Sequence, residues 1–133
     1  MDIIVPISMG ELVDKLSILD IKLRKIDQKS KKKNIQKEYK ILEKQYLKIK
    51  KKYNKVDYYL NEIKSVNEEI WQLQDLSKEK ILNNKFDKEY VIFSTNIHNL
   101  NDKRFQLKSE INALFDSKII EEKSYKHLNI DSI

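Results

Sequence analysis

Apolar residues recur at steps of three and four along most of the chain, the spacing that keeps one face of an α-helix apolar. The first series covers residues 12–26 and the second covers residues 35–56. A third covers residues 60–73, and the longest covers residues 86–114 with every step equal to three or four. This pattern is typical of helical bundles and coiled coils, and it predicts four long helices.

The residues that break regular structure are confined to the start of the chain. Its only proline, Pro6, and its only glycine, Gly10, precede the first apolar series, so the rest runs without such breaks. Ser8 and Glu11 fit a capping box, in which Ser8 accepts from the Glu11 amide and the Glu11 carboxylate reaches back to the cap. Residues 3–5 are β-branched and predict a short extended arm, which should lie against the helices or pair with another chain.

The ends of the apolar series predict the remaining boundaries. The first helix should end between residues 27 and 33. Asp57 should cap the third, unless the second and third helices run on with only a kink. Residues 76–86, which contain two consecutive asparagines, predict the next turn, and the tail should fold back after residue 116. We therefore predict an all-α antiparallel bundle of three or four long helices, with their order in space left open.

This bundle is expected to be a single domain. Its 133 residues are enough for one modest core. The domain should span residues 1–133, with an extended arm at residues 1–7 and a C-terminal tail at residues 117–133.

The positive charge of the chain is concentrated in one lysine-rich segment. The formal net charge is +6, whereas residues 28–55 alone carry twelve Lys against two Glu. Such a field attracts a nucleic-acid backbone or an anionic membrane surface. However, the tyrosines of this segment follow its apolar stripe, so they are not placed to stack on bases, and a solvated helix face is the simpler interpretation. Polyanion binding by this segment is kept as an alternative.

Composition narrows the possible chemistry further. Without cysteine there is no disulfide and no thiolate, and a single glycine cannot build a Gly-rich phosphate loop. His98 and His127 have no ligand at metal-binding spacing, so we expect no metal site, no catalytic residues of known pattern and no cofactor. No apolar run reaches the roughly 18–20 residues that span a bilayer, and the N-terminus does not resemble a signal peptide. We expect a cytoplasmic protein with no membrane span.

Arg104 is the exception in the longest apolar series, because it occupies a position where the pattern calls for an apolar residue. Helical spacing places Asn101, Lys108 and Asn112 near it on one face. Two further polar stripes lie on the other predicted helices. They comprise Glu11, Lys15 and Lys22 on the first helix, and Asn67, Trp71 and Asp75 on the third. If the helices bring these stripes together, a half-buried polar pocket results.

Two interpretations of this pocket follow from its residue types. It is either a site for a phosphate or carboxylate ligand, or a structural network that fixes helix register. In the network, Arg104 would pair with Asp75, Asp14 or Glu11. A third hypothesis is a small enzyme that acts by electrostatics on an anionic metabolite. Arg104, Lys108 and Lys15 would then be the charged groups, and Glu11 or Asp75 the proton carrier.

Three blocks of the chain resemble a family of small all-helical bacterial proteins of unknown function. They are residues 5–22, residues 67–75 around Trp71, and a C-terminal block of residues 101–104, Lys108, residues 111–112 and residues 117–125. The resemblance implies a gene neighbourhood of glycosyltransferases and other surface-polysaccharide genes, and it supplies no catalytic residue. The lysine-rich second helix and the tail beyond Tyr125 depart from the family pattern.

These observations predict a non-catalytic binding or accessory module. It would use the polar cluster to bind a protein partner, such as a glycosyltransferase, or an anionic small molecule. The link to cell-surface glycan biosynthesis comes only from the resemblance. A homodimer is compatible with the wide apolar stripes, whereas the identity of the partner and the burial of Arg104 are left open.

Overall fold

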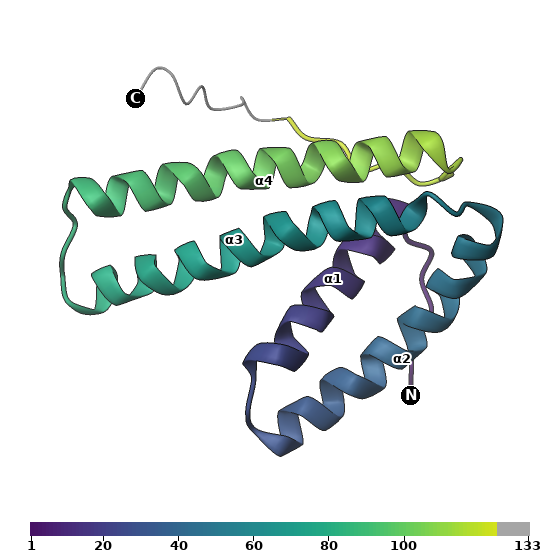
Figure 1. The fold of residues 1–133 in the computed structure, drawn as a ribbon, viewed down its shortest axis with the longest axis horizontal. Helices are drawn as coiled ribbons and strands as arrows, with labels where there is room; N and C mark the ends of the chain where they lie inside the picture. The colour runs from purple at the N-terminus through teal and green to yellow at the C-terminus, as the bar shows by residue number, and fades with distance from the viewer. Residues whose placement is uncertain (125–133) are drawn as a thin grey trace.

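The computed structural model describes residues 1–124 and contains four helices. They are α1 (Met9–Lys25), α2 (Lys29–Lys52), α3 (Val56–Leu82) and α4 (Lys88–Leu114), as Figure 1 shows. No strand occurs within residues 1–124, so the predicted all-α fold is confirmed. None of the helices in this part of the chain is long and apolar enough to cross a membrane.

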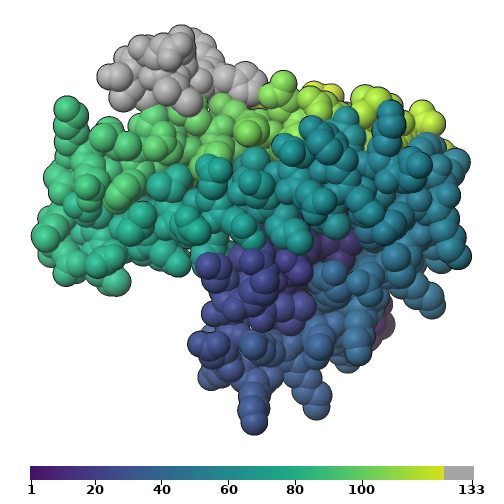
Figure 2. Space-filling model, in the orientation of Figure 1, coloured from purple at the N-terminus to yellow at the C-terminus, as the bar shows by residue number. Residues whose placement is uncertain are grey.

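The helices form two antiparallel hairpins that meet at one end. Helices α3 and α4 pair along their length, and the α1–α2 hairpin leaves at an angle from one half of that pair (Figures 1 and 2). Helix α1 packs against all three others, whereas α2 touches α3 only briefly and does not reach α4. The central element is therefore α1, and α2 is attached to the fold mainly through it.

The hydrophobic core lies where the two hairpins meet. Every helix contributes to it, together with the residue that follows α4. Its buried members are Val13, Leu16, Tyr46, Val56, Ile63, Ile111 and Phe115. The buried residues of α3 end at Ile70, and those of α4 begin at Lys108. The other half of the α3–α4 pair, residues 71–103, projects beyond the core and is called the distal arm here.

The start of α1 agrees with the predicted cap only in part. The Ser8 Oγ accepts a hydrogen bond from the Glu11 amide at 3.0 Å, as expected. The Glu11 carboxylate does not reach back to the cap, because it binds Lys108 instead. Residues 1–7 have no regular structure, and Ile3 and Ile4 are 85% and 95% exposed. The prediction that this arm lies against the helices is therefore wrong, and pairing with another chain stays a prediction.

Two predicted boundaries need correction. Helix α1 ends at Lys25, earlier than the expected 27–33. Lys55, not Asp57, is the N-cap of α3, and Asp57 lies in the first turn of that helix. There its carboxylate accepts hydrogen bonds from the Tyr46 hydroxyl and forms an ion pair with Lys50. The side chain is thus used to join α2 to α3 and not to cap a helix.

The other two turns lie where the sequence predicts them, but the first is shorter than expected, because residues 76–82 belong to α3. The α3–α4 turn contains Asn84 at φ 52°, a left-handed conformation that asparagine tolerates. After α4, Asp116 adopts φ 53° and the chain reverses. It then runs back along α4, where Lys123 donates to Asp102 at 3.0 Å. The remainder of the predicted tail, residues 125–133, lies outside the described residues.

Candidate functional site

The carboxylate of Asp14 is fully buried and forms the centre of a polar cluster. It accepts from Arg104 of α4, at 2.8 Å from Nε and also from Nη2, and from Asn67 Nδ2 of α3 at 2.9 Å. A buried charge is costly unless it is paired and hydrogen-bonded, and both conditions are met here. One side chain of α1 therefore ties three helices together.

Ser17 lies one turn after Asp14 and completes the hydrogen bonding of Asn67. Its Oγ accepts from Asn67 Nδ2 at 2.7 Å and donates to the Asp14 carbonyl at 2.7 Å. The two N–H groups of the Asn67 amide are thus both used, one by a carboxylate and one by a hydroxyl. This part of the cluster is saturated and leaves no donor for a ligand.

Lys108 lies one turn after Arg104 on α4 and connects the cluster to the C-terminal segment. Its side chain is 8% exposed, and its Nζ donates to Glu11 at 2.8 Å and to Glu121 at 2.7 Å. The Asp14 carboxylate is 3.7 Å away. One nearly buried ammonium therefore holds two carboxylates, one from α1 and one from the segment after α4.

Both cations of the cluster remain charged. Burial lowers the pKa of Lys108, but hydrogen bonds to Glu11 and Glu121 outweigh this and leave the pKa above its usual value. For Arg104, burial again lowers the pKa, and the hydrogen bonds and charge of Asp14 raise it further than burial lowers it. Neither group is suited to exchange a proton near neutral pH.

Gly10 allows α1 to approach α4 closely enough to form the cluster. Its amide donates to Asn112 Oδ1 at 2.8 Å. A Cβ at this position would lie 2.6 Å from the Lys108 carbonyl oxygen and 3.0 Å from Asn112 Oδ1. The absence of a side chain therefore sets the helix separation that lets Glu11 reach Lys108. The Asn112 Nδ2 is buried and has no partner among residues 1–124.

A hollow of about 200 Å³ opens beside the cluster, between α4 and the returning C-terminal segment. We call it the α4 hollow. Its lining residues are Asn101, Arg104, Phe105, Lys108, Glu121 and Lys123. The Arg104 side chain is 28% exposed, and its hydrogen bonds to Asp14 use Nε and Nη2 but not Nη1. The hollow is smaller than typical pockets for drug-sized ligands, so its size suits a small anionic group.

Six of the ten predicted site residues lie in the cluster or line the hollow. They are Glu11, Asn67, Asn101, Arg104, Lys108 and Asn112. Lys15 lies at the edge, where it is 3.9 Å from Glu11. Of the proposed partners of Arg104, Asp14 is the correct one.

Three predicted site residues are not brought into the cluster. Asp75 is exposed on the distal arm, and Trp71 and Lys22 are half-buried. No hydrogen bond or ion pair in the described part of the chain joins any of the three to the cluster.

Sequence reasoning missed Ser17 and Glu121, and it named Asp14 only as one of three partners. A signal for the first helix was present, because Gly10, Asp14, Ser17 and Ile21 follow steps of four, three and four. This is a second helical stripe beside the leucines, and its small and polar members are all buried. No comparable signal marks Glu121, since its position depends on the chain reversal at residue 116.

The fold and cluster define an all-α protein whose two hairpins are joined through one buried carboxylate. Within residues 1–124, no group of three or more His, Asp and Glu side chains is placed to hold a metal ion. Residues 3–131 match DUF6165, a family of unknown function, and the chain therefore belongs to that family. No curated protein and no solved structure matches the chain. The resemblance to a family of unknown function is confirmed, while the bacterial origin and the gene neighbourhood stay predictions.

Proposed function

We propose that the protein is a non-catalytic binding module that accepts a carboxylate or phosphate group in the α4 hollow. The observation that carries this proposal is the contact between Lys108 and Glu121. A nearly buried ammonium is bound there by an acidic side chain from outside the helices, next to an open hollow. An external anion could make the same contact in place of Glu121.

The charges of the cluster support such an exchange. Arg104 and Lys108 carry two positive charges, which Asp14 and Glu11 balance within the helices. Glu121 adds a third negative charge from the C-terminal segment. An incoming anion that displaced it would restore the same local charge, so the exchange would not leave a buried charge unpaired.

The other lining residues indicate the kind of ligand. Asn101 offers an amide, Arg104 an unused part of its guanidinium, and Phe105 an apolar wall. These groups fit an oxyanion attached to a small ring or sugar better than a free ion. A phosphorylated sugar has this chemistry and agrees with the glycan link that the resemblance implies. An acidic side chain of a protein partner, such as a glycosyltransferase, is the other source of the same group.

The enzyme hypothesis gains no support from the arrangement. It required Glu11 or Asp75 as a proton carrier beside Arg104 and Lys108. Glu11 is held by Lys108 and Lys15, and Asp75 is exposed on the distal arm. Arg104 and Lys108 cannot replace the missing proton carrier, because their raised pKa values keep them protonated.

The lysine-rich α2 remains a second candidate surface without a further observation in its favour. Only Tyr46 of this helix is buried, and its lysines are exposed or half-buried. Polyanion binding there predicts a steep loss of affinity for a nucleic acid between about 50 and 200 mM salt. A flat salt response would remove this candidate.

Calorimetric titration with inorganic phosphate and with glucose 1-phosphate tests the proposed site. The chain has only two arginines, so Arg104→Lys can be compared with a matched Arg24→Lys control on the surface of α1. We expect binding in the wild type, a loss of about tenfold or more in Arg104→Lys, and no change in Arg24→Lys. Absence of binding at about 10 mM ligand, or equal losses in both variants, would contradict the proposal.

Affinity capture from a nuclease-treated lysate at physiological salt separates the two sources of the anion. If the ligand is a side chain of a partner, a defined protein should be retained by the wild type and released by added phosphate. If it is a small molecule, the titration should give binding without such a protein.

A further inference from the structure

The distal arm is a two-helix hairpin, and within residues 1–124 no further helix packs on it. Within residues 71–103 no side chain reaches full burial, and large apolar side chains remain in contact with solvent. The most exposed are Leu76, Ile81, Leu82, Phe86, Val91 and Ile92. Figure 2 shows that the α1–α2 hairpin lies under only the other half of the α3–α4 pair. Large exposed apolar side chains gathered on one arm are typical of an interaction site.

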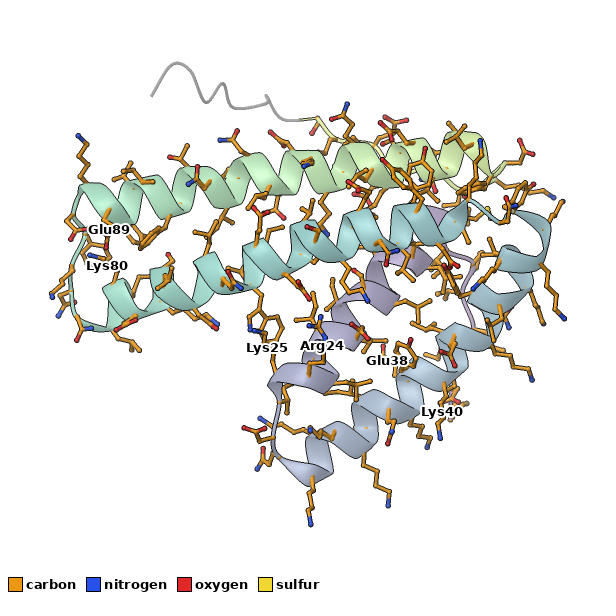
Figure 3. All side chains as sticks on the ribbon, in the orientation of Figure 1. Arg24, Lys25, Glu38, Lys40, Lys80 and Glu89 are labelled. Carbon is orange, nitrogen blue, oxygen red and sulfur yellow. The ribbon has the colours of Figure 1, made fainter. Side chains whose placement is uncertain are left out.

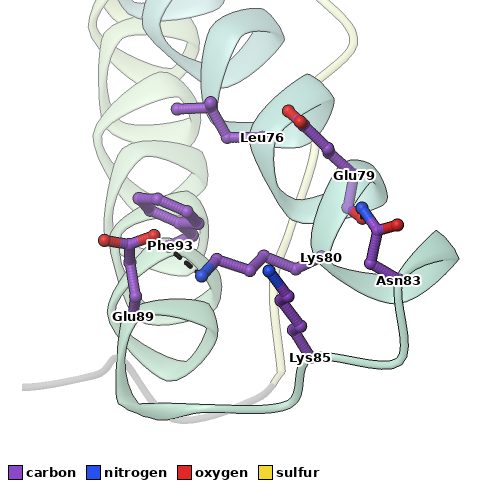
Figure 4. Close-up of a pocket in the computed structure, with 7 residues that line it drawn as sticks. All are labelled: Leu76, Glu79, Lys80, Asn83, Lys85, Glu89 and Phe93. Atoms are coloured by element: carbon purple, nitrogen blue, oxygen red, sulfur yellow. Dashed lines mark hydrogen bonds and ion pairs between the residues drawn. The ribbon is translucent and has the colours of Figure 1, made fainter.

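Two adjoining hollows run along the arm between α3 and α4. The larger, of about 470 Å³, has Leu73, Leu76 and Leu100 among its lining residues and is mostly apolar. The smaller, of about 220 Å³, is shown in Figure 4 and is lined by Leu76 and Phe93 beside the Lys80–Glu89 ion pair. Both hollows include Leu76, so they adjoin at this residue, and together they are called the groove here.

The charge of the arm differs from that of the rest of the molecule. Residues 71–103 contain five Lys, three Asp and two Glu, so their formal net charge is zero. The segment of residues 28–55 carries twelve Lys and two Glu, a net charge of +10. Two copies of this chain would repel through α2, whereas their arms can approach without repulsion.

We propose that the arm docks on the arm of a second copy of this chain, which gives a dimer with a four-helix bundle at its centre. A pair of amphipathic helices lacks half of such a bundle, and a two-fold axis supplies the other half from an identical surface. This proposal is independent of the α4 hollow, since none of the residues that line that hollow also lines the groove.

The shape of the molecule sets the direction of the pairing. The α1–α2 hairpin projects from the core end of the α3–α4 pair, so two parallel arms would bring both hairpins to the same end (Figure 1). An antiparallel pairing places them at opposite ends and sets α3 against α3 and α4 against α4.

Charge pairing across the axis agrees with this direction. If the axis passes near Leu76, each α3 residue meets one equally far on the other side of Leu76. Glu69, at one end of the larger hollow, then lies opposite the uncharged Asn83 of the second copy, so no like charges meet there. On α4, Lys103 meets Glu89 of the second copy, which is 61% exposed in the single chain. The contact between Lys103 and Glu89 joins opposite charges at the edge of an apolar centre.

Sedimentation equilibrium between about 1 and 100 µM protein tests the dimer. The wild type should reach twice the 16.0 kDa mass of one chain. Leu76→Glu should shift the equilibrium to the monomer by about a hundredfold or more, because it would bury a charge at the axis. The matched control is Leu47→Glu on α2, since Leu47 and Leu76 are 49% and 44% exposed, and it should stay dimeric. A monomeric wild type, or equal effects of the two changes, would overturn the proposal.

Cross-linking of a cysteine variant tests the position of the axis without relying on a disruptive change. The chain has no cysteine, so Leu76→Cys and Leu47→Cys each introduce a single thiol. A short bis-maleimide should join two Leu76→Cys chains rapidly at dilute protein, and it should leave Leu47→Cys largely unlinked. Equal and slow cross-linking of both variants would show that the arms do not meet at Leu76.

Discussion

Asp14 shows how a single residue can determine the arrangement of three helices. Its carboxylate is fully buried and receives three hydrogen bonds, two from Arg104 and one from Asn67. These bonds compensate the loss of water only if all partners are present. The cluster is therefore sensitive to loss of any one member.

Asp14→Asn should destabilise the fold by about 3 kcal/mol, because it leaves Arg104 without its carboxylate in a half-buried position. Urea unfolding followed by circular dichroism measures the change. The control is Asp20→Asn, since Asp20 forms ion pairs near the surface of α1 and should cost about 1 kcal/mol or less. Equal losses in the two variants would contradict the central role of Asp14.

Tyr46 should resist ionisation at high pH. Burial, followed by its hydrogen bond to Asp57, raises its pKa above the ordinary value of 10.0. The stabilisation of the fold by the neutral Tyr46 hydroxyl is complete below pH 10. It decreases as the pH rises further, because only the neutral phenol fits the site. At pH 11, the tyrosinate absorbance of Tyr46→Phe should equal that of the wild type, because Tyr46 is not ionised in the wild type at this pH. A smaller absorbance in the variant at that pH would contradict this.

For single residues, the sequence showed which position was unusual more readily than it showed which residues that position contacts. Arg104 was identified because it interrupts an apolar series, and the structure shows that its guanidinium faces a buried carboxylate. The role of Asp14 was less visible, since a polar residue one position from an apolar stripe can also lie on a solvated face. Glu121 could not be found, because its contact depends on how the chain turns after α4.

The helices themselves were predictable because their apolar spacing and their lack of breakers agree. The boundaries of the helices were harder to predict. Asp57 has the side chain of an N-cap, but it lies inside the first turn of α3, where it contacts Tyr46 and Lys50 of α2. Capping preference is worth about 1 kcal/mol, and contacts between helices can override it.

Gly10→Ala tests the close packing of α1 on α4. In an ordinary helix, Ala is more stable than Gly by about 1 kcal/mol. Here the added Cβ would meet backbone atoms of Lys108 at 2.6 Å, so we expect a loss of about 1–3 kcal/mol instead. Thermal unfolding gives the sign directly, with the exposed Ser65→Ala on α3 as a control that should be neutral or slightly stabilising. A stabilised Gly10→Ala protein would show that the helices are not in close contact.

For the whole molecule, the sequence predicted the fold class but not the angle between the hairpins. Apolar stripes show which faces are covered, and they do not show by which helix. The stripe of α4 extends over the distal arm, where its residues are only partly covered because α1 leaves the α3–α4 pair at an angle (Figure 1). The arm therefore extends away from α1. Figure 3 shows the Lys80–Glu89 pair at the far end of the arm, away from Arg24 on α1.

Hydrogen exchange should divide the α3–α4 pair into two parts. Residues 56–70 and 104–114 lie against the core and should exchange slowly, while the distal arm should exchange faster in dilute protein. If arms pair between copies, protection of the arm should rise with protein concentration while that of the core segments stays constant. Uniform protection along both helices at low concentration would contradict this division.

The most direct test of the proposed function compares phosphate binding by Glu121→Gln and by its neighbour variant Glu122→Gln. If the Glu121 carboxylate occupies the site of the ligand, its removal should increase the affinity for glucose 1-phosphate by about tenfold or more. Glu122→Gln makes the same change of charge one residue away and should bind like the wild type. An unchanged or weaker affinity in Glu121→Gln would show that the contact between Lys108 and Glu121 is purely structural.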